Sequence, residues 1–371
     1  MKNLITAIGL MSGTSCDGID ASAIKSDGEN EAHFVGDYFF PYEEKIRSKI
    51  RELKERINTI SDLEKNTSEI AVLEKELTFL HAQTINLLIK KLKITKSEID
   101  LVGLHGHTIF HSFKDKKSKQ IGDGKLLSQL IGLNVVYNFR ENDVKNGGQG
   151  APLVPIFHKL LQKKIKLKTP LIFVNIGGIS NLTYLHTKNK MISFDTGPGN
   201  FLIDKFIQLK SKNKIQFDKD GLIAFKGNLD KNILDSYLKD PYYESLPPKS
   251  LDVGDFNLSS LRGLNLENAI TTLSELTSIT IVSALNFFDV RPKEIILSGG
   301  GRKNKYIFER IKKMSKIPTS SIDDYKINGD FIESQAFAYL AIRSFLKKFI
   351  SFPGTTGVPK PLTGGELIKI K

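Results

Sequence analysis

Hydrophobic positions along this chain follow two periods, and the change between them predicts where strands and helices lie. Apolar runs at 4–10 and 19–25 flank a short polar turn, which predicts a strand, a turn and a second strand. From about 43 to 92, apolar residues recur every three or four positions, so this stretch is expected to be helical. A polar break at 66–68 favours a pair of packed surface helices over a coiled coil.

Strand and helix patterns alternate through the rest of the chain. Helices are predicted around 153–165, around 265–288 and over "IESQAFAYLAIRSFLKKF". Turns containing glycine follow apolar strands at 9–18, 177–178, 197–199 and 299–301. The alternation predicts the α/β class, and the repeated turns suggest two related halves. The tail from 351, rich in Gly and Pro, is expected to pack irregularly.

Length and composition narrow the class of protein. A chain of 371 residues, 40% hydrophobic and 26% charged, predicts a soluble globular protein with one large or two ordinary domains. The single cysteine, Cys16, excludes an intramolecular disulfide and indicates a reducing compartment. No apolar run approaches the roughly 20 residues that a membrane-spanning helix needs. The N-terminal apolar run lacks a signal-peptide cleavage site, so we expect a cytoplasmic protein without a membrane partner.

The net charge of +13 raises the question of nucleic-acid binding. The lysines are spread along the whole chain, and aromatic residues do not interleave with them as a base-stacking surface would require. We therefore expect no nucleic-acid partner. An electropositive site for an anionic small molecule is the favoured explanation.

The turn in "GLMSGTSCDGID", residues 9–20, is the first candidate site. Its glycines permit unusual backbone angles and a close approach of N–H groups to an anion, and Ser12, Thr14 and Ser15 add hydroxyl groups. It is not a Walker loop, because no G-K-[ST] follows and the next element is predicted to be a strand. A phosphate-binding hairpin and an ordinary tight turn remain equally open.

Two carboxylates lie in the same stretch. Beside phosphates a carboxylate is repulsive unless it holds a cation, so Asp17 or Asp20 is a candidate Mg²⁺ ligand, directly or through water. Capping of local N–H groups explains each of them equally well.

The segment "SFDTGPGN" places Asp195 at the end of a predicted strand, before a turn that opens a helix near Asn200. Ligands of α/β proteins collect at such strand ends. Asp195 is a candidate general base, and the turn amides favour a nearby anion. The alternative is a carboxylate that caps the helix.

Two further motifs are less specific. "LSGGGRKN" would let the backbone approach an adenine or a ribose, although a packing turn explains it almost as well. The histidines of "HGHTIFH", at 105, 107 and 111, permit a metal site. No cysteine is near them and the other histidines are scattered, so a hydrogen bond from one of them to a substrate is favoured.

Taken together, the motifs resemble the anhydro-N-acetylmuramic acid kinase family over nearly the whole chain. The resemblance rests on "GLMSGTSCDGID", "HGHTIFH", "QIGDG", "NFRENDVKNGGQGAPLVPIFH", "NIGGISNL", "FDTGPGN", "PPKS", "GGG" and "ESQAFAYLA". Each motif alone is weak, but "MSGTS-x-DG-x-D", "GGQGAPLVP" and "DTGPGN" are specific as a set.

The resemblance implies an actin/hexokinase-like fold of two ribonuclease-H-like α/β lobes, with ATP and a sugar in the cleft between them. We expect one lobe to be 1–125 with 350–371, and the other to be 126–349. The implied reaction has two parts: water opens the ring of 1,6-anhydro-N-acetylmuramic acid, and O6 takes the γ-phosphoryl group of ATP. A homodimer is compatible with this family. The alternatives are a simpler sugar or carboxylate kinase of the same fold, and a nucleotide-gated binding protein.

The resemblance also implies roles for particular residues. Asp195 would be the catalytic base, and Asp17 the residue that meets Mg²⁺. The residues implied at the sugar are His105, Arg140, Asn175 and Glu333. Those implied at ATP are Gly13, Thr14, Ser15, Cys16, Asp17, Gly18, Ile19, Asp20, Gly178, Gly299, Gly300, Gly301 and Asn304. Cys16 is expected to be only a small side chain at a variable position.

Three departures from the family pattern leave roles open. His107 stands where the family usually has Gln, and Asn138 stands where it has Asp, so only Arg140 carries over from that motif. After "PPKS", the sequence "LDVGD" replaces T-G-R-E, which puts contacts from this loop in doubt.

Overall fold

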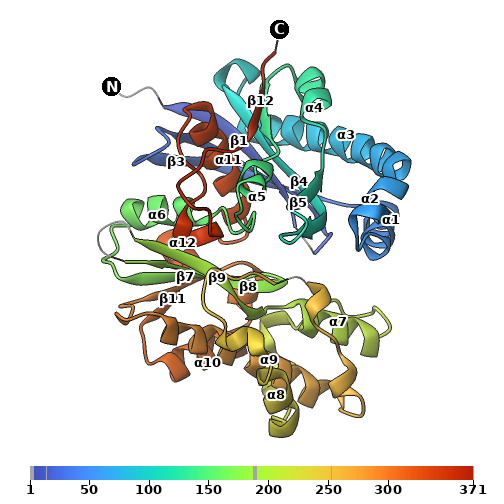
Figure 1. Ribbon diagram of the computed structural model, residues 1–371, viewed down its shortest axis with the longest axis vertical. Coiled ribbons are helices and arrows are strands. Elements are labelled where there is room, and N and C mark those ends of the chain that lie inside the picture. The colour runs from blue at the N-terminus through green and yellow to red at the C-terminus, as the bar shows by residue number, and fades with distance from the viewer. Residues whose placement is uncertain (1–3, 14, 187–189, 252, 371) are drawn as a thin grey trace. The chain divides into compact units, whose positions relative to one another are not determined.

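The fold comes from a computed structural model that describes residues 4–13, 15–186, 190–251 and 253–370. The chain forms two compact units, one of Met1–Lys166 with Phe331–Lys371 and the other of Leu167–Asp330 (Figure 1). Each unit is built around its own sheet with helices packed on it, so the predicted two-part α/β architecture is confirmed.

The first unit holds a sheet whose strands run in the order β12-β6-β4-β1-β2-β3, with β5 paired to β4. β1, β2 and β3 form an antiparallel meander, while β4 and β6 run parallel to β1. The strands are β1 Ile5–Ser12, β2 Gly18–Ser26, β3 Ala32–Pro41, β4 Leu101–Ser112, β5 Lys117–Ile121, β6 Asn134–Tyr137 and β12 Glu366–Ile368. The predicted strand–turn–strand at the start is confirmed as β1 and β2. The prediction lacked β3, which extends the meander.

Helices of this unit cover 44–92 and the segments between its strands. They are α1 Glu44–Arg56, α2 Ile60–Lys65, α3 Thr67–Leu92, α4 Gly124–Ile131, α5 Glu141–Lys145, α6 Pro155–Lys164, α11 Ile332–Phe345 and α12 Pro353–Thr356. The predicted break at 66–68 is real, since α2 ends at Lys65 and α3 begins at Thr67. A capping box between Thr59 and Asp62 starts α2, which makes three helices where two were expected.

Helix α11 packs directly on the backbone of β1 and β4. A Cβ atom at Gly9 would lie 2.0 Å from the carbonyl oxygen of Ser334, and one at Gly103 would lie 2.4 Å from that of Phe337. Side chains larger than hydrogen at these two positions would therefore push the helix off the sheet. This contact makes the segment after 331 part of the first unit.

The boundaries between the units differ from the predicted ones at 125/126 and 349/350. β6 pairs with β4, so the segment after 126 completes the first sheet. Likewise, α11 packs on β1 and β4. The tail is also more regular than predicted, because β12 pairs with β6 along its length. These unit boundaries depend on contacts between distant segments, so no linker-like composition marks them in the sequence.

The second unit repeats the strand order of the first around a five-stranded sheet, β11-β10-β7-β8-β9. β7, β8 and β9 form an antiparallel meander, and β10 and β11 run parallel to β7. The strands are β7 Leu171–Ile176, β8 Ile179–Leu185, β9 Met191–Pro198, β10 Ile295–Ser298 and β11 Thr319–Ser321. In both units the third strand is followed by helices before the fourth strand returns beside the first. The suggestion of two related halves agrees with this shared topology.

In the described part of the second unit, the α-helices pack on one another through α9, which lies against β8 and β9. They are α7 Phe201–Lys210, α8 Lys231–Leu238, α9 Leu266–Ser283 and α10 Lys305–Ser315. α9 is the most deeply buried, with apolar side chains and hydroxyl groups inside. Across the described ranges, no helix has the length and apolarity that crossing a membrane requires.

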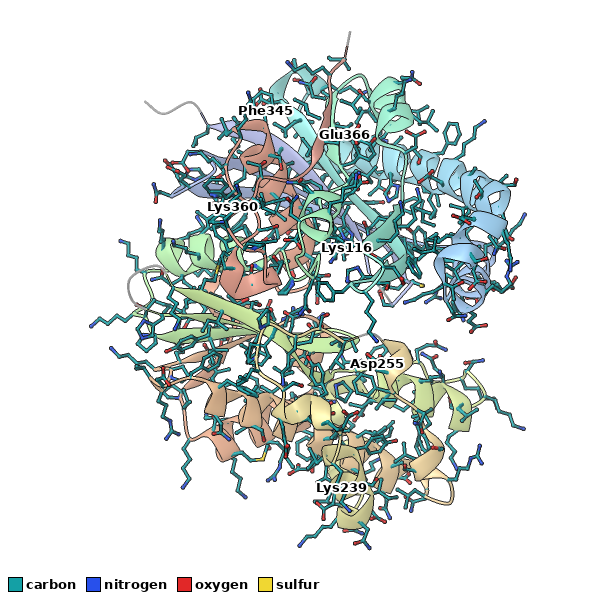
Figure 2. The ribbon with its side chains drawn as sticks, in the orientation of Figure 1. Lys116, Lys239, Asp255, Phe345, Lys360 and Glu366 are labelled. Atoms are coloured by element: carbon teal, nitrogen blue, oxygen red, sulfur yellow. The ribbon has the colours of Figure 1, made fainter. Side chains whose placement is uncertain are left out.

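The positive charge is distributed over many elements. Lys116, Lys239 and Lys360 are exposed in a turn, after a helix and in the tail, respectively (Figure 2). This distribution agrees with the spread of lysines along the sequence.

Four histidine rings are buried in the first unit: His81, His105, His107 and His158. Burial lowers the pKa of His107 and of His158 to about 3, and that of His81 to about 4. Burial also holds the pKa of His105 well below its usual value. All four rings are therefore neutral in the folded protein at pH 7.

The buried rings predict a strong pH dependence of stability. Each takes up a proton only on unfolding, so its contribution is complete above pH 6.5 and is lost as the pH falls toward the native pKa. Each histidine is expected to cost about 1.4 kcal/mol of unfolding free energy between pH 7.5 and 5.5. His158→Gln should make the pH dependence shallower by that amount, measured by urea unfolding.

His33→Gln is the matched control, because the His33 ring is exposed on β3. Equal pH slopes for His158→Gln and the wild-type protein would show that His158 is protonated in the folded state.

Candidate functional site

The turn between β1 and β2 presents polar groups at its tip. The Cys16 N–H donates to the Gly13 carbonyl at 3.1 Å and closes the turn, with Cys16 in the left-handed region at φ +54°. The Ser15 hydroxyl donates to the Asp17 carboxylate at 2.6 Å, and both side chains are exposed. Thr14, predicted at ATP, lies outside the described residues. The tip of this hairpin therefore carries a hydroxyl, a carboxylate and backbone groups toward solvent.

The other residues predicted at ATP in this stretch lie in β2 or just before it, and β2 begins with Gly18, Ile19 and Asp20. The side chains of Ile19 and Cys16 are buried, and Ile19 pairs with Phe40 of β3. The Tyr42 N–H donates to the Asp17 carbonyl at 2.9 Å, and Arg47 Nε donates to the Cys16 carbonyl at 3.2 Å. The start of α1 and the segment before it thus hold the hairpin from below.

Three of the four predicted sugar-binding residues meet in the first unit. Arg140 Nε donates to His105 Nε2 at 2.9 Å, so the proton of this neutral ring is on Nδ1, which faces the Gly106 carbonyl at 2.9 Å. The His105 ring also packs against Phe337 at 4.3 Å between centroids. Burial raises the pKa of Glu333, and the positive charge of Arg140 opposes that shift. Segments near 105, 140 and 333 therefore form one polar cluster.

A buried carboxylate, which was not predicted from the sequence, orders the loop that positions Arg140. Asp143 Oδ1 accepts from the Gly150 N–H at 2.6 Å, and its other oxygen accepts from Thr356 Oγ1 at 2.5 Å. Arg140 Nη1 in turn donates to the Gly150 carbonyl at 2.8 Å. The motif "NDVKNGGQG" gave a signal, since an aspartate before a glycine-rich turn commonly accepts turn N–H groups.

Asp195 lies in β9 of the second unit and is held from three directions. Its N–H donates to the Lys249 carbonyl at 3.1 Å, and its carbonyl accepts from the Tyr242 hydroxyl at 2.6 Å. Its Oδ2 accepts from the Leu251 N–H at 2.9 Å. The N-cap of α7 is Asn200, whose side chain makes no capping hydrogen bond.

The loop after "PPKS", whose contacts the departure from T-G-R-E put in doubt, does reach Asp195. It does so through the backbone N–H of Leu251, which any residue other than proline could supply at that position. Lys249 anchors the same loop: its ammonium group donates to the Tyr242 carbonyl at 2.7 Å and packs on three aromatic rings. Burial lowers the pKa of Lys249 to about 8. Neither Lys249 nor Tyr242 was predicted as a functional residue from the sequence.

A cavity of about 210 Å³ lies on the other face of β9. Phe194 and Thr196 line it together with Lys249, Tyr243 and Phe287. Because neighbouring side chains of a strand point to opposite faces, Asp195 does not belong to this cavity. It is also smaller than most ligand pockets.

The glycine turns of the second unit pack against one another. The N–H groups of Gly199 and Phe201 donate to the Gly178 carbonyl at 2.9 and 3.2 Å, so the β7–β8 turn rests on the start of α7. At Gly299, with φ +74°, a Cβ atom would lie 2.3 Å from Asn175 Oδ1. The predicted residues Asn175, Gly178 and Gly299–Gly301 are thus brought together. Asn304 instead caps α10, accepting from the Ile307 N–H.

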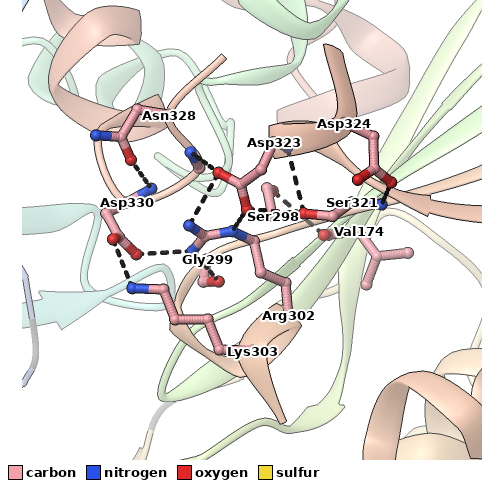
Figure 3. A network of polar contacts seen from close by, with 11 residues as sticks. Val174, Ser298, Gly299, Arg302, Lys303, Ser321, Asp323, Asp324, Asn328 and Asp330 are labelled. Atoms are coloured by element: carbon pink, nitrogen blue, oxygen red, sulfur yellow. Dashed lines mark hydrogen bonds and ion pairs between the residues drawn. The ribbon is translucent and has the colours of Figure 1, made fainter. Parts of the chain in front are cut away.

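A buried arginine holds the triple-glycine turn (Figure 3). Arg302 donates to both carboxylate oxygens of Asp323, at 2.6 and 3.1 Å, to Asp330 at 2.7 Å and to the Gly299 carbonyl at 2.9 Å. Its side chain is 3% exposed, whereas those of Asp323 and Asp330 are 44% and 40% exposed. Burial opposes ionisation of Asp323, but the bonds from Arg302 and the Gly329 N–H prevail and lower its pKa to about 2.

Comparison with known proteins agrees with the motifs. The family described as "Anhydro-N-acetylmuramic acid kinase" matches residues 5–369. The anhydro-N-acetylmuramic acid kinase of Pelagibacter ubique is 47% identical over the full length of both chains. That of Zymomonas mobilis is 38% identical over 97% of this chain and 99% of its own. The (R)-2-hydroxyglutaryl-CoA dehydratase component A of Acidaminococcus fermentans aligns over 92% of this chain and all of its own, with a TM-score of 0.48 and 8% identity.

The Arg302 network predicts a measurable loss of stability. Arg302→Met removes hydrogen bonds to two carboxylates and one carbonyl, and should lower the free energy of unfolding by about 1–3 kcal/mol. Arg302→Lys should lower the free energy of unfolding by a smaller amount, because lysine keeps the positive charge. Exposed Arg262 in the same unit supplies the control Arg262→Met in urea unfolding. Equal stabilities of the two methionine variants would mean that the network contributes nothing.

Proposed function

This chain belongs to the anhydro-N-acetylmuramic acid kinase family, and on that premise we propose how its residues carry out the reaction. As a phosphotransferase of this family, it uses ATP. The overall change is that 1,6-anhydro-N-acetylmuramic acid, water and ATP become N-acetylmuramic acid 6-phosphate and ADP. The reaction needs a base for water, groups that hold the sugar, and groups that position the triphosphate.

The held position of Asp195 is the observation that carries the proposal. Its backbone and one carboxylate oxygen are fixed by Lys249, Tyr242 and Leu251, which leaves little freedom for the side chain. In the proposed step, Asp195 takes a proton from water as the water oxygen attacks C1 on the face opposite the bridge. The C1–O6 bond breaks, as in an inverting glycosidase.

The second half of the proposed reaction is phosphoryl transfer. The O6 atom freed from C1 attacks the γ-phosphorus, and the bond to the β-phosphate oxygen breaks to release ADP. No second carboxylic acid is required, because the phosphoryl group takes the place of a proton on O6. Positioning and charge neutralisation account for most catalysis of this kind.

We assign the β1–β2 hairpin to the ATP phosphates and the turn at Gly299–Gly301 to the adenosine. The backbone at Gly13 suits an anion, and so does the exposed hydroxyl of Ser15 once it turns from the Asp17 carboxylate toward the ligand. Asn304, buried as the cap of α10, supports the turn.

A magnesium ion fits these residues. Mg²⁺ commonly keeps several waters and takes one or two carboxylates together with substrate phosphates. Within the described ranges, no three His, Cys, Asp or Glu side chains group together as metal ligands. Asp17, exposed beside Ser15, is the residue that would hold it, and Asp20 is the next nearest carboxylate in the sequence. The ion would neutralise charge on the phosphates.

The cluster of His105, Arg140 and Glu333 is proposed to bind the sugar with Asn175. Arg140 is the one cation among these four residues, and its charge suits the carboxylate of a muramic acid. His105 and the Gly150 carbonyl orient its guanidinium group. The single cysteine and the small anionic substrates agree with a cytoplasmic location.

Replacing Asp195 tests the base. Asp195→Asn should lower kcat by about 10²–10⁴-fold, because the amide cannot accept the proton from water. The affinity for ADP, measured by titration calorimetry, should stay the same. Asp235→Asn, a change of the same kind at an exposed position of α8, should leave turnover unchanged. Full activity of Asp195→Asn would remove Asp195 from the mechanism.

Isotope labelling tests the reaction itself. With the anhydro sugar, MgATP and ¹⁸O-water, mass spectrometry should find one ¹⁸O at C1 of the product and none in its phosphate. Label in free phosphate without a sugar product would indicate an ATPase. Turnover of unbridged N-acetylmuramic acid alone would indicate an ordinary sugar kinase.

A further inference from the structure

His107 bridges the two ends of the turn between β1 and β2. Its Nδ1 lies 3.1 Å from the hydroxyl of Ser12, the last residue of β1. Its Nε2 lies 3.6 Å from the sulfur of Cys16, whose N–H closes the turn. The ring is 1% exposed, so it lies beneath the hairpin and not among the groups that face a ligand.

An irregularity in β4 brings His107 to this place. Leu10 pairs with Leu104, but Ser12 pairs with His107, so β4 contains one residue more than β1 over this stretch. The extra residue is accommodated at Gly106, which has φ +75°. Bulges of this kind commonly redirect a side chain beside an active site.

The hydrogen-bond partners assign the proton on the ring. The Tyr42 hydroxyl donates to Ser12 Oγ at 3.0 Å, which leaves the Ser12 proton for Nδ1 of His107. The proton of the neutral ring is then on Nε2 and points to the Cys16 sulfur. One chain of donors and acceptors therefore runs from Tyr42 through both ends of the hairpin.

We propose that His107 is a positioning residue for ATP, which holds both ends of the β1–β2 turn so that Gly13 and Ser15 meet the phosphates in a fixed geometry. The inference rests on the proposed phosphate-binding function of the hairpin. Three residues separate Ser12 from Cys16, so fixing both ends restricts the turn between them. Small displacements of phosphate-binding groups cost rate, because phosphoryl transfer depends on alignment.

Glutamine can make the same bridge in principle, since its amide offers one oxygen acceptor and one N–H donor group. Leucine keeps the apolar volume but makes neither hydrogen bond. The pair His107→Gln and His107→Leu therefore separates the bridge from the packing of the ring.

Steady-state kinetics tests the proposal. His107→Leu should lower kcat/KM for ATP about tenfold or more with little change in KM for the sugar, and His107→Gln should recover most of that loss. His158→Gln is the control for losing a buried imidazole, because His158 is buried in α6 of the same unit. It should lower the melting temperature without changing kcat/KM for ATP.

Cys16→Ala removes the sulfur at the other end of the bridge. This variant tests the proposal even if His107→Leu does not fold. It should raise KM for ATP, and in the His107→Gln background it should abolish the recovery. Unchanged ATP kinetics in both His107→Leu and Cys16→Ala, or an equal loss in His158→Gln, would overturn the proposal. Failure of the wild-type protein to make the phosphorylated sugar would instead refute the proposed function, so the two failures are distinguishable.

Discussion

The close backbone contact of α11 with β1 and β4 is the constraint on which the first unit depends. It is possible because Gly9 and Gly103 have no side chain to separate helix from sheet. Through it, a segment more than 300 residues from the N-terminus becomes part of the first core. The same contact sets Glu333, in the first turn of α11, within the electrostatic reach of Arg140 and brings Phe337 against His105. Packing of a helix thus assembles a polar cluster from three distant segments.

Backbone groups hold most of the candidate functional residues in both units. Leu251 contributes an N–H to Asp195, Gly150 contributes a carbonyl to Arg140, and the Gly178 carbonyl receives two N–H groups from the next turn. Backbone contacts do not depend on which side chain a residue carries. This explains how the chain keeps the arrangement around Asp195 although "LDVGD" stands in place of the usual family sequence. Arg302 and Asp143 are exceptions, because each holds a turn with a charged side chain. Arg302 donates to the Gly299 carbonyl, and Asp143 accepts from the Gly150 N–H.

Much of the fold could be predicted, because strands and helices leave periodic patterns that need no knowledge of their neighbours. The α/β class, the first hairpin and the long helices follow from that pattern. β3 and β12 were missed, and the unit boundaries lie elsewhere, since strand pairing is decided by partners far away in the sequence. Among candidate site residues, those inside glycine-rich motifs were identified. Lys249 and Tyr242 were not, because an isolated lysine or tyrosine has no local signature. Asp143 was not identified either, although the glycine-rich turn that follows it is a local signal.

By itself, then, the sequence determined which elements form and which motifs carry polar chemistry, because these depend on residues close together in the chain. "GLMSGTSCDGID" predicted two strands joined by a polar turn. Only the tertiary structure decided what lies beneath it: a bulge at Gly106 turns His107 toward Ser12 and Cys16. It also gave two aspartates different roles, since the Asp195 carboxylate accepts an N–H from one loop and the Asp143 carboxylate orders another. A side chain's function depends on its partners in space, and folding brings those partners from distant parts of the chain.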